Sequence, residues 1–193
     1  MGVNYEALVA EHRPTAETWD AFVRETLLPG WLASYVERTP RDADVLVIPQ
    51  DALTYLFDAA PTMLDATSGD DRVVAVWGQS RLAPAQRDRD RQRGFIPNPP
   101  TWSRSGHDRG HFVAHAAGGG MDMNLFPQAA GLNRGNTDQG KTWKAIESHA
   151  AANPGTALFV RPTYSGPTWV PATIDYGLLV DDRLWCEQFD NRD

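Results

Sequence analysis

Apolar side chains in the first third of the chain recur at the spacing of one helix face. After Pro14-Thr15, a pair typical of a helix start, this face is formed by Trp19, Phe22, Val23 and Leu27. Pro29-Gly30 is expected to end the helix, and the apolar residues at positions 31, 32 and 35 predict a second helical segment. Residues 1–70 are therefore expected to be mainly helical.

A further short helix and then a strand are expected next. Asp51 should cap the helix, which carries apolar side chains at Leu53, Leu56 and Phe57. Residues 73–77 change the pattern, because a short run of β-branched and aromatic side chains is typical of a buried strand. The prolines of residues 94–106 and the glycines of residues 118–120 predict loops.

The last third of the chain predicts a helix followed by strands. Trp143, Ile146 and Ala150 fit one helix face, and this pattern stops at Asn153-Pro154-Gly155. Residues 157–161, 172–180 and 183–189 have strand-like apolar patterns, and Asp181-Asp182 is a candidate hairpin turn. The order of elements predicts an α+β fold in a single domain, residues 1–193.

Composition places this chain among ordinary soluble globular proteins. It has 193 residues, of which 41% are hydrophobic, and no apolar run approaches the length needed to cross a bilayer. The first ten residues lack the features of a secretory signal, so we expect a cytoplasmic location, or export by a route that needs no signal peptide. The single cysteine, Cys186, excludes an internal disulfide and a cysteine-rich zinc site.

The net charge of −7 argues against a nucleic-acid partner unless positive charge is concentrated locally. Arg81 and the arginines at positions 87, 89, 91 and 93 supply such charge, although Asp88 and Asp90 interrupt the run. The run has two interpretations, a solvated loop or a set of phosphate contacts.

Three histidines, His107, His111 and His115, lie within nine residues. In a helix they would stack on one face and could bind zinc, but the glycines at positions 106 and 110 weigh against a helix. In an extended segment His107, Arg109 and His111 would share one face, and Asp108 would point to the other. His115 is expected to be a polar residue of a turn or of the core.

The extended arrangement suits the hydrolysis of a phosphodiester bond. This reaction needs a base to take a proton from water, a cation on the phosphate oxygens and usually a metal ion. The imidazole of His111 and the guanidinium of Arg109 could supply the first two. Residues 124–134 are rich in side-chain amides, whose oxygens can bind Mg²⁺, although asparagine beside glycine or proline is also typical of turns.

These residues resemble a known family, the DNA/RNA non-specific endonucleases, a branch of the ββα-metal or His-Me finger nucleases. The segment 108–111, Asp-Arg-Gly-His, is similar to the signature of that family. Further positions in the order and spacing of the family are Asn124, Gln128 and Asn133, followed by the helical pair Trp143 and Glu147. The resemblance covers about residues 106–147.

The resemblance implies a role for each matching residue. His111 would activate water, Arg109 would stabilise the transition-state phosphate, and Glu147 would orient metal-bound water. Asn133 would hold a Mg²⁺ or Mn²⁺ ion. The remaining candidates are Asp108 and Asn124 as further residues of the catalytic site, and Gln128, Arg134 and Lys141 as substrate contacts. Asn124 and Gln128 would support the others.

The resemblance also implies a ββα-metal core within residues 71–193, with DNA, RNA or both as substrate. No base-reading element is visible, so low sequence specificity is expected. The chain is similar to bacterial members that act as toxins or defence effectors, for which a cognate inhibitor (immunity) protein would be a partner.

Two alternatives remain open. Residues 135–142 satisfy the phosphate-binding loop pattern of nucleotide hydrolases, with Lys141 as the phosphate contact and residues 178–181 as the accompanying metal-binding strand. That pattern works only after a buried parallel strand, and the residues preceding Gly135 make a poor strand. The other alternative is a catalytically inactive nucleic-acid-binding protein of the nuclease fold.

Overall fold

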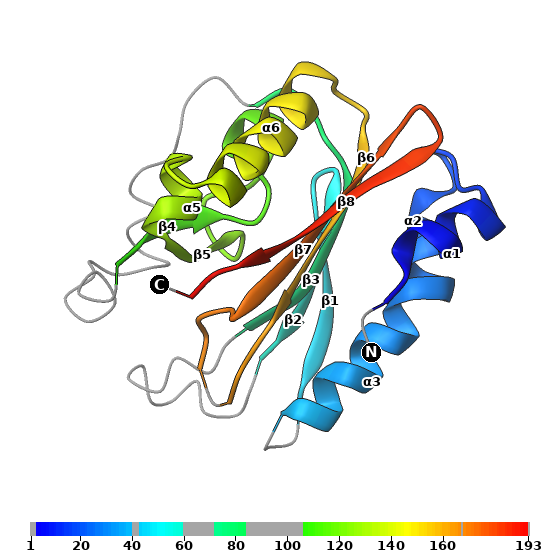
Figure 1. The fold of residues 1–193 in the computed structure, drawn as a ribbon. Helices are drawn as coiled ribbons and strands as arrows, with labels where there is room; N and C mark the ends of the chain where they lie inside the picture. The colour runs from blue at the N-terminus through cyan, green and yellow to red at the C-terminus, as the bar shows by residue number, and fades with distance from the viewer. Residues whose placement is uncertain (1–2, 40–42, 60–71, 84–105, 167, 193) are drawn as a thin grey trace.

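The computed structural model describes residues 3–39, 43–59, 72–83, 106–166 and 168–192. A six-stranded antiparallel sheet with strand order β1-β2-β3-β6-β7-β8 forms its centre (Figure 1). The strands are β1 (Val45–Gln50), β2 (Leu53–Asp58), β3 (Arg72–Gln79), β6 (Ala157–Thr163), β7 (Thr173–Val180) and β8 (Arg183–Asp190). The fold is therefore a mixed α+β fold, as the order of sequence patterns predicts.

Helices of the N-terminal region cover one face of this sheet (Figure 1). They are α1 (Tyr5–His12), α2 (Trp19–Phe22), the π-helical turn η1 (Val23–Leu27) and α3 (Leu28–Arg38). The rings of Trp19 and Trp31 lie 6.4 and 5.3 Å from the ring of Phe159 on β6. Residues of β6 alternate between the two faces, so Phe159 packs under the helices and its neighbours Leu158 and Val160 face the other side.

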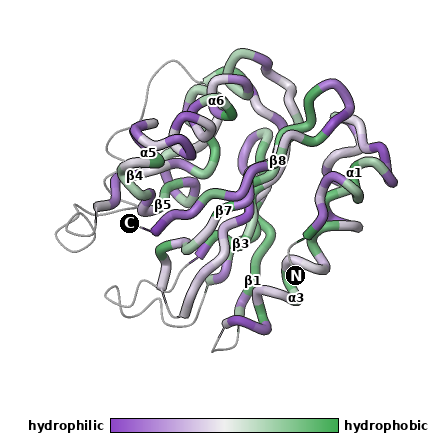
Figure 2. Tube along the Cα trace, in the orientation of Figure 1, coloured by the Kyte–Doolittle hydropathy of each residue, from purple (hydrophilic) through white to green (hydrophobic). Residues whose placement is uncertain are grey.

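A second layer covers the opposite face. It contains β4 (His107–His111), the 3-10 helix η4 (His115–Ala117), β5 (Leu125–Ala129), α5 (Ala130–Arg134) and α6 (Asp138–Ala152). α6 buries Trp143, whose ring lies 5.3 Å from that of Tyr176 and 5.0 Å from that of Phe189. The central strands β3, β6 and β7 are thus buried on both faces. Figure 2 shows the edge strand β8 as largely hydrophilic and the edge strand β1 as largely hydrophobic.

Several sequence predictions are confirmed. Residues 73–77 lie within the buried strand β3, and α6 ends at Ala152 with Asn153 as its C-cap. The C-terminal strands β7 and β8 form a hairpin, whose turn residues Asp181 and Asp182 have φ angles of 49° and 60°. Such angles match the right-handed twist of a two-residue hairpin.

The helix predicted for residues 51–57 is wrong, because these residues form β2 and the turn before it. β2 pairs with β1 on one side and β3 on the other, and its register with β3 shifts between Leu56 and Phe57. Both faces of β2 are buried, because Leu53 and Phe57 pack in the core beneath α6 and Leu56 packs in the core beneath the N-terminal helices. Apolar side chains therefore lie three and four positions apart, which resembles a helix face. Asp51 has a φ of 58° in the β1–β2 turn and caps no helix.

The predicted end of the helix at Pro29-Gly30 is also wrong. Pro29 lies in the first turn of α3, where the missing backbone N–H carries no penalty, and the helix continues to Arg38. The mainly helical region therefore ends well before residue 70, because β1 and β2 follow it. The arginine run at residues 87–93 and most of the loop predicted at residues 94–106 lie outside the described residues.

Within the described part of the chain, we find no helix that is both long and apolar enough to span a membrane.

Candidate functional site

The histidine cluster is extended at its start, as the glycines at positions 106 and 110 indicated, so the alternative of a zinc-binding helix face is not realised. β4 pairs with β5 in an antiparallel register that sets Arg109 opposite Pro127 and His111 opposite Leu125. His115 lies beyond β4 in η4, is buried, and has its Nδ1 atom 3.3 Å from the carbonyl oxygen of Gly119. Among the described residues, no group of three or more His, Cys, Asp or Glu side chains is placed to hold a metal ion.

One cleft of about 420 Å³ brings together several of the sequence-based candidates. Its polar and charged lining comes from β4, η4, α5 and α6, and includes Arg109, His111, His115, Asn133, Lys144 and Glu147. Four of these six residues are sequence-based candidates, separated by up to 38 positions along the chain. Arg109 and His111 reach the same cleft because they lie two residues apart on one strand.

The close packing of α5 against α6 places Asn133 near Glu147. α5 ends at Gly135, which has a φ of 73°, and Thr137 caps α6 by accepting a 3.0 Å hydrogen bond from the backbone N–H of Gly140. A Cβ atom on Gly140 would overlap the carbonyl oxygen of Gly131. Only a glycine at position 140 therefore allows the two helices to approach this closely.

Asp108 does not line the cleft, and its carboxylate instead holds two residues of α5. Arg134 donates two hydrogen bonds of 2.7 Å to it, and the side-chain nitrogen Nδ2 of Asn133 donates one of 3.2 Å. The hydrogen bonds from Arg134, aided by that from Asn133, lower the pKa of the Asp108 carboxyl below its usual value. Because an ionised carboxylate only accepts hydrogen bonds, Nδ2 of Asn133 must face Asp108, which leaves Oδ1 as the available ligand atom.

Asn124 and Gln128 are fully buried and lie behind the cleft. The Asn124 amide donates to the carbonyl oxygens of Val113 at 2.8 Å and Gly120 at 3.1 Å, and accepts from the N–H of Val113 at 3.0 Å. These bonds fix the loop that follows β4. The side chain of Gln128 fills the space beside Gly110, where a Cβ atom would overlap it.

Two predicted substrate contacts lie away from the cleft lining. Arg134 is bound to Asp108, as described above, and the exposed Lys141 makes a 2.8 Å ion pair with Asp138 in the first turn of α6. The cleft also contains a cation that is not among the sequence-based candidates. Lys144 lines the cleft and donates a 2.7 Å hydrogen bond to the carboxylate of Glu147. Its three-residue spacing from Glu147 on a helix was the signal that could have found it.

The nucleotide-site alternative lacks its structural basis. Residues 135–142 follow the helix α5, whereas a phosphate-binding loop must follow a buried parallel strand. The backbone N–H of Gly140 is already bonded to Thr137. Residues 178–181 belong to the antiparallel hairpin of β7 and β8 and its turn, so this alternative lacks the accompanying metal-binding strand as well.

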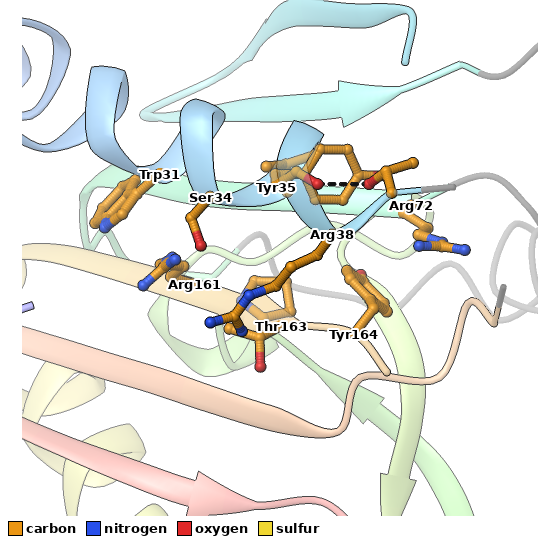
Figure 3. Close-up of a pocket in the computed structure, with 11 residues that line it drawn as sticks. Trp31, Ser34, Tyr35, Arg38, Arg72, Arg161, Thr163 and Tyr164 are labelled. Carbon is orange, nitrogen blue, oxygen red and sulfur yellow. Dashed lines mark hydrogen bonds between the residues drawn. The ribbon is translucent and has the colours of Figure 1, made fainter. Parts of the chain in front are cut away.

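A second pocket lies between α3 and the strand β6, on the face of the sheet opposite the cleft (Figure 3). It holds only about 20 Å³, the space of a water molecule. Arg161, which lines it, lies 3.5 Å from the carboxylate of Asp175 and 3.2 Å from the hydroxyl of Tyr5, so its charge is compensated within the protein. None of the predicted site residues lines this pocket.

No protein-family model matches the chain, and no curated protein matches it. The function of the protein is therefore inferred from the residues and geometry of the cleft.

Proposed function

We propose that this protein is a metal-dependent nuclease that hydrolyses phosphodiester bonds of DNA, RNA or both without reading their sequence. The observation that carries the proposal is that Arg109, His111, Asn133 and Glu147 line one cleft, although they come from three different elements. The succession of β4, β5 and α5 also supports it, because an antiparallel hairpin followed by a helix is the order that a ββα-metal core requires.

His111 is the proposed general base. Free imidazole has a pKa near neutrality, so a histidine ring in its neutral form can take a proton from an attacking water. Arg109 lies two residues earlier on the same strand and lines the same cleft. Its guanidinium is the proposed contact for the phosphate oxygens, on which negative charge grows in the transition state.

The donor set of the cleft fits a hard divalent cation. Asn133 presents an amide oxygen because Asp108 engages the amide nitrogen, and the carboxylate of Glu147 lines the same cleft. Mg²⁺ and Mn²⁺ favour oxygen ligands, and Mg²⁺ usually keeps several of its waters, so few protein ligands suffice. A bound ion would supply electrostatic stabilisation of the phosphate.

Local charge in the cleft also suits a phosphate substrate, despite the net charge of −7 for the whole chain. Arg109 and Lys144 contribute two cations to the lining, and among the described lining residues Glu147 is the single carboxylate. Contacts to the phosphate backbone carry no sequence information, so such a cleft would cut without sequence preference.

The test is incubation of the purified protein with plasmid DNA and with RNA, in Mg²⁺ or in EDTA. Wild type should degrade at least one polymer only in Mg²⁺, and His111→Ala should lower the rate by roughly 10²- to 10⁴-fold or more. His149→Ala is the matched control, because His149 lies on α6 but does not line the cleft. An undiminished rate in His111→Ala would exclude His111 as the base, and binding without cleavage by wild type would favour the inactive nucleic-acid-binding alternative.

A further inference from the structure

Two lysines occupy equivalent positions one turn apart on α6. Lys141 pairs with Asp138 and Lys144 pairs with Glu147, and in both cases the partner is three residues away on the helix. Their surroundings differ. The side chains of Lys141 and Asp138 are 70% and 97% exposed and lie outside the cleft, whereas those of Lys144 and Glu147 are 43% and 14% exposed and line it.

The side chain of Lys144 makes two contacts that hold it in the cleft. A Cβ atom on Gly135, the residue that ends α5, would lie 3.3 Å from Cγ of Lys144, so the aliphatic stem runs beside the end of α5. The Nζ atom is held by the largely buried carboxylate of Glu147 at 2.7 Å. These two contacts place the stem of Lys144 beside the end of the helix that carries Asn133 and its positive charge on the carboxylate of Glu147.

We propose that Lys144 contacts a phosphate of the bound nucleic acid, as a second cation beside Arg109. This inference rests on the proposed function and names a binding residue for it. Arg109 reaches the cleft from β4 and Lys144 reaches it from α6, so a strand lying in the cleft would meet a cation from each element. An ion pair that is partly open to water is weak, so the ammonium can exchange its carboxylate partner for a phosphate oxygen.

Binding in EDTA tests this assignment without catalysis. The probe is a short fluorescein-labelled oligothymidylate, and its Kd is measured by fluorescence anisotropy at several salt concentrations. Removing one phosphate contact should weaken binding about tenfold and reduce the slope of log K against log salt by about 0.7 for a single strand. Lys144→Met should show both effects, Lys144→Arg should keep the wild-type slope, and Lys141→Met should bind as wild type does.

Lys141→Met is a matched control because it removes the same charge from the same helix face. Equal Kd values and slopes for Lys144→Met and Lys141→Met would overturn the inference, since general electrostatic attraction would then explain the affinity. Thermal melting of each variant checks the fold, and Lys144→Gln offers a polar replacement if Lys144→Met melts early. A wild-type protein that binds but does not cleave in Mg²⁺ contradicts only the proposed function, and one that does neither overturns both proposals.

Discussion

The side-chain nitrogen of Asn133 donates a 3.2 Å hydrogen bond to the carboxylate of Asp108. This bond joins β4 to α5 and fixes which end of the Asn133 amide is available as a ligand. Arg134, the next residue, adds two hydrogen bonds to the same carboxylate. Asp108 is therefore a positioning residue for the proposed metal ligand, because it does not line the cleft.

Removing Asp108 should weaken the response to metal more than removing Arg134. Asp108→Ala frees the Asn133 amide to rotate, whereas Arg134→Ala leaves the hydrogen bond between Asp108 and Asn133 in place. Loss of such a supporting contact typically costs 10- to 100-fold in metal affinity, so the Mg²⁺ concentration for half-maximal nuclease activity should rise by about that factor in Asp108→Ala. Equal shifts in the two variants would show that the ion pair, and not the amide contact, matters.

Acid should remove the stabilisation that Asp108 contributes. Its folded-state pKa is lowered, chiefly by the hydrogen bonds from Arg134, so near pH 4 the unfolded state binds more protons than the folded state. The contribution is present above the ordinary carboxyl pKa and is lost as the pH falls through the lowered value. Urea unfolding of wild type and Asp108→Asn should therefore give a stability difference that is constant near neutral pH and shrinks below about pH 4. A pH-independent difference would contradict this account.

Gly140→Ala should destabilise the protein, because the new methyl group would overlap the carbonyl oxygen of Gly131 and crowd Gly135. Both contacts are backbone atoms, which cannot move aside as a flexible side chain can. Overpacking of this kind costs about 1–3 kcal/mol in the free energy of unfolding. Gly30→Ala in α3 is the control, since a Cβ atom there meets nothing within 4 Å, and it should be neutral or stabilising in chemical denaturation.

Asp182→Gly should stabilise the β7–β8 hairpin. Asp182 has a φ of 60°, a left-handed conformation that an L-residue adopts at a cost and glycine adopts freely. The expected gain in the free energy of unfolding is about 1 kcal/mol, with unchanged nuclease activity, because the turn lies away from the cleft lining. A lower unfolding midpoint would mean that the Asp182 side chain makes a stabilising interaction.

The sequence predicted the cleft better than it predicted the N-terminal region. Arg109 and His111 could be placed on one face from the two-residue alternation of a strand alone. That alternation depends only on neighbouring residues in the sequence. The β2 strand was mistaken for a helix because both of its faces are buried, and this burial depends on the layers that pack on either side of the sheet and not on a local rule. The 3.6-residue period of a helix places Lys141 and Lys144 on one face of α6. Which of the two lysines lines the cleft depends on how α5 packs against α6, and the sequence pattern does not show that packing.

The alternation of side chains along β6 links the two cores that lie on opposite faces of the sheet. Leu158 and Val160 belong to the core beneath α6, while Ala157 and Phe159 belong to the core beneath the N-terminal helices. Neither core can lose its packing without disturbing a strand that the other core needs. Heat should therefore melt the helical layer and the cleft together in one cooperative transition, so that the calorimetric and van't Hoff enthalpies of unfolding agree.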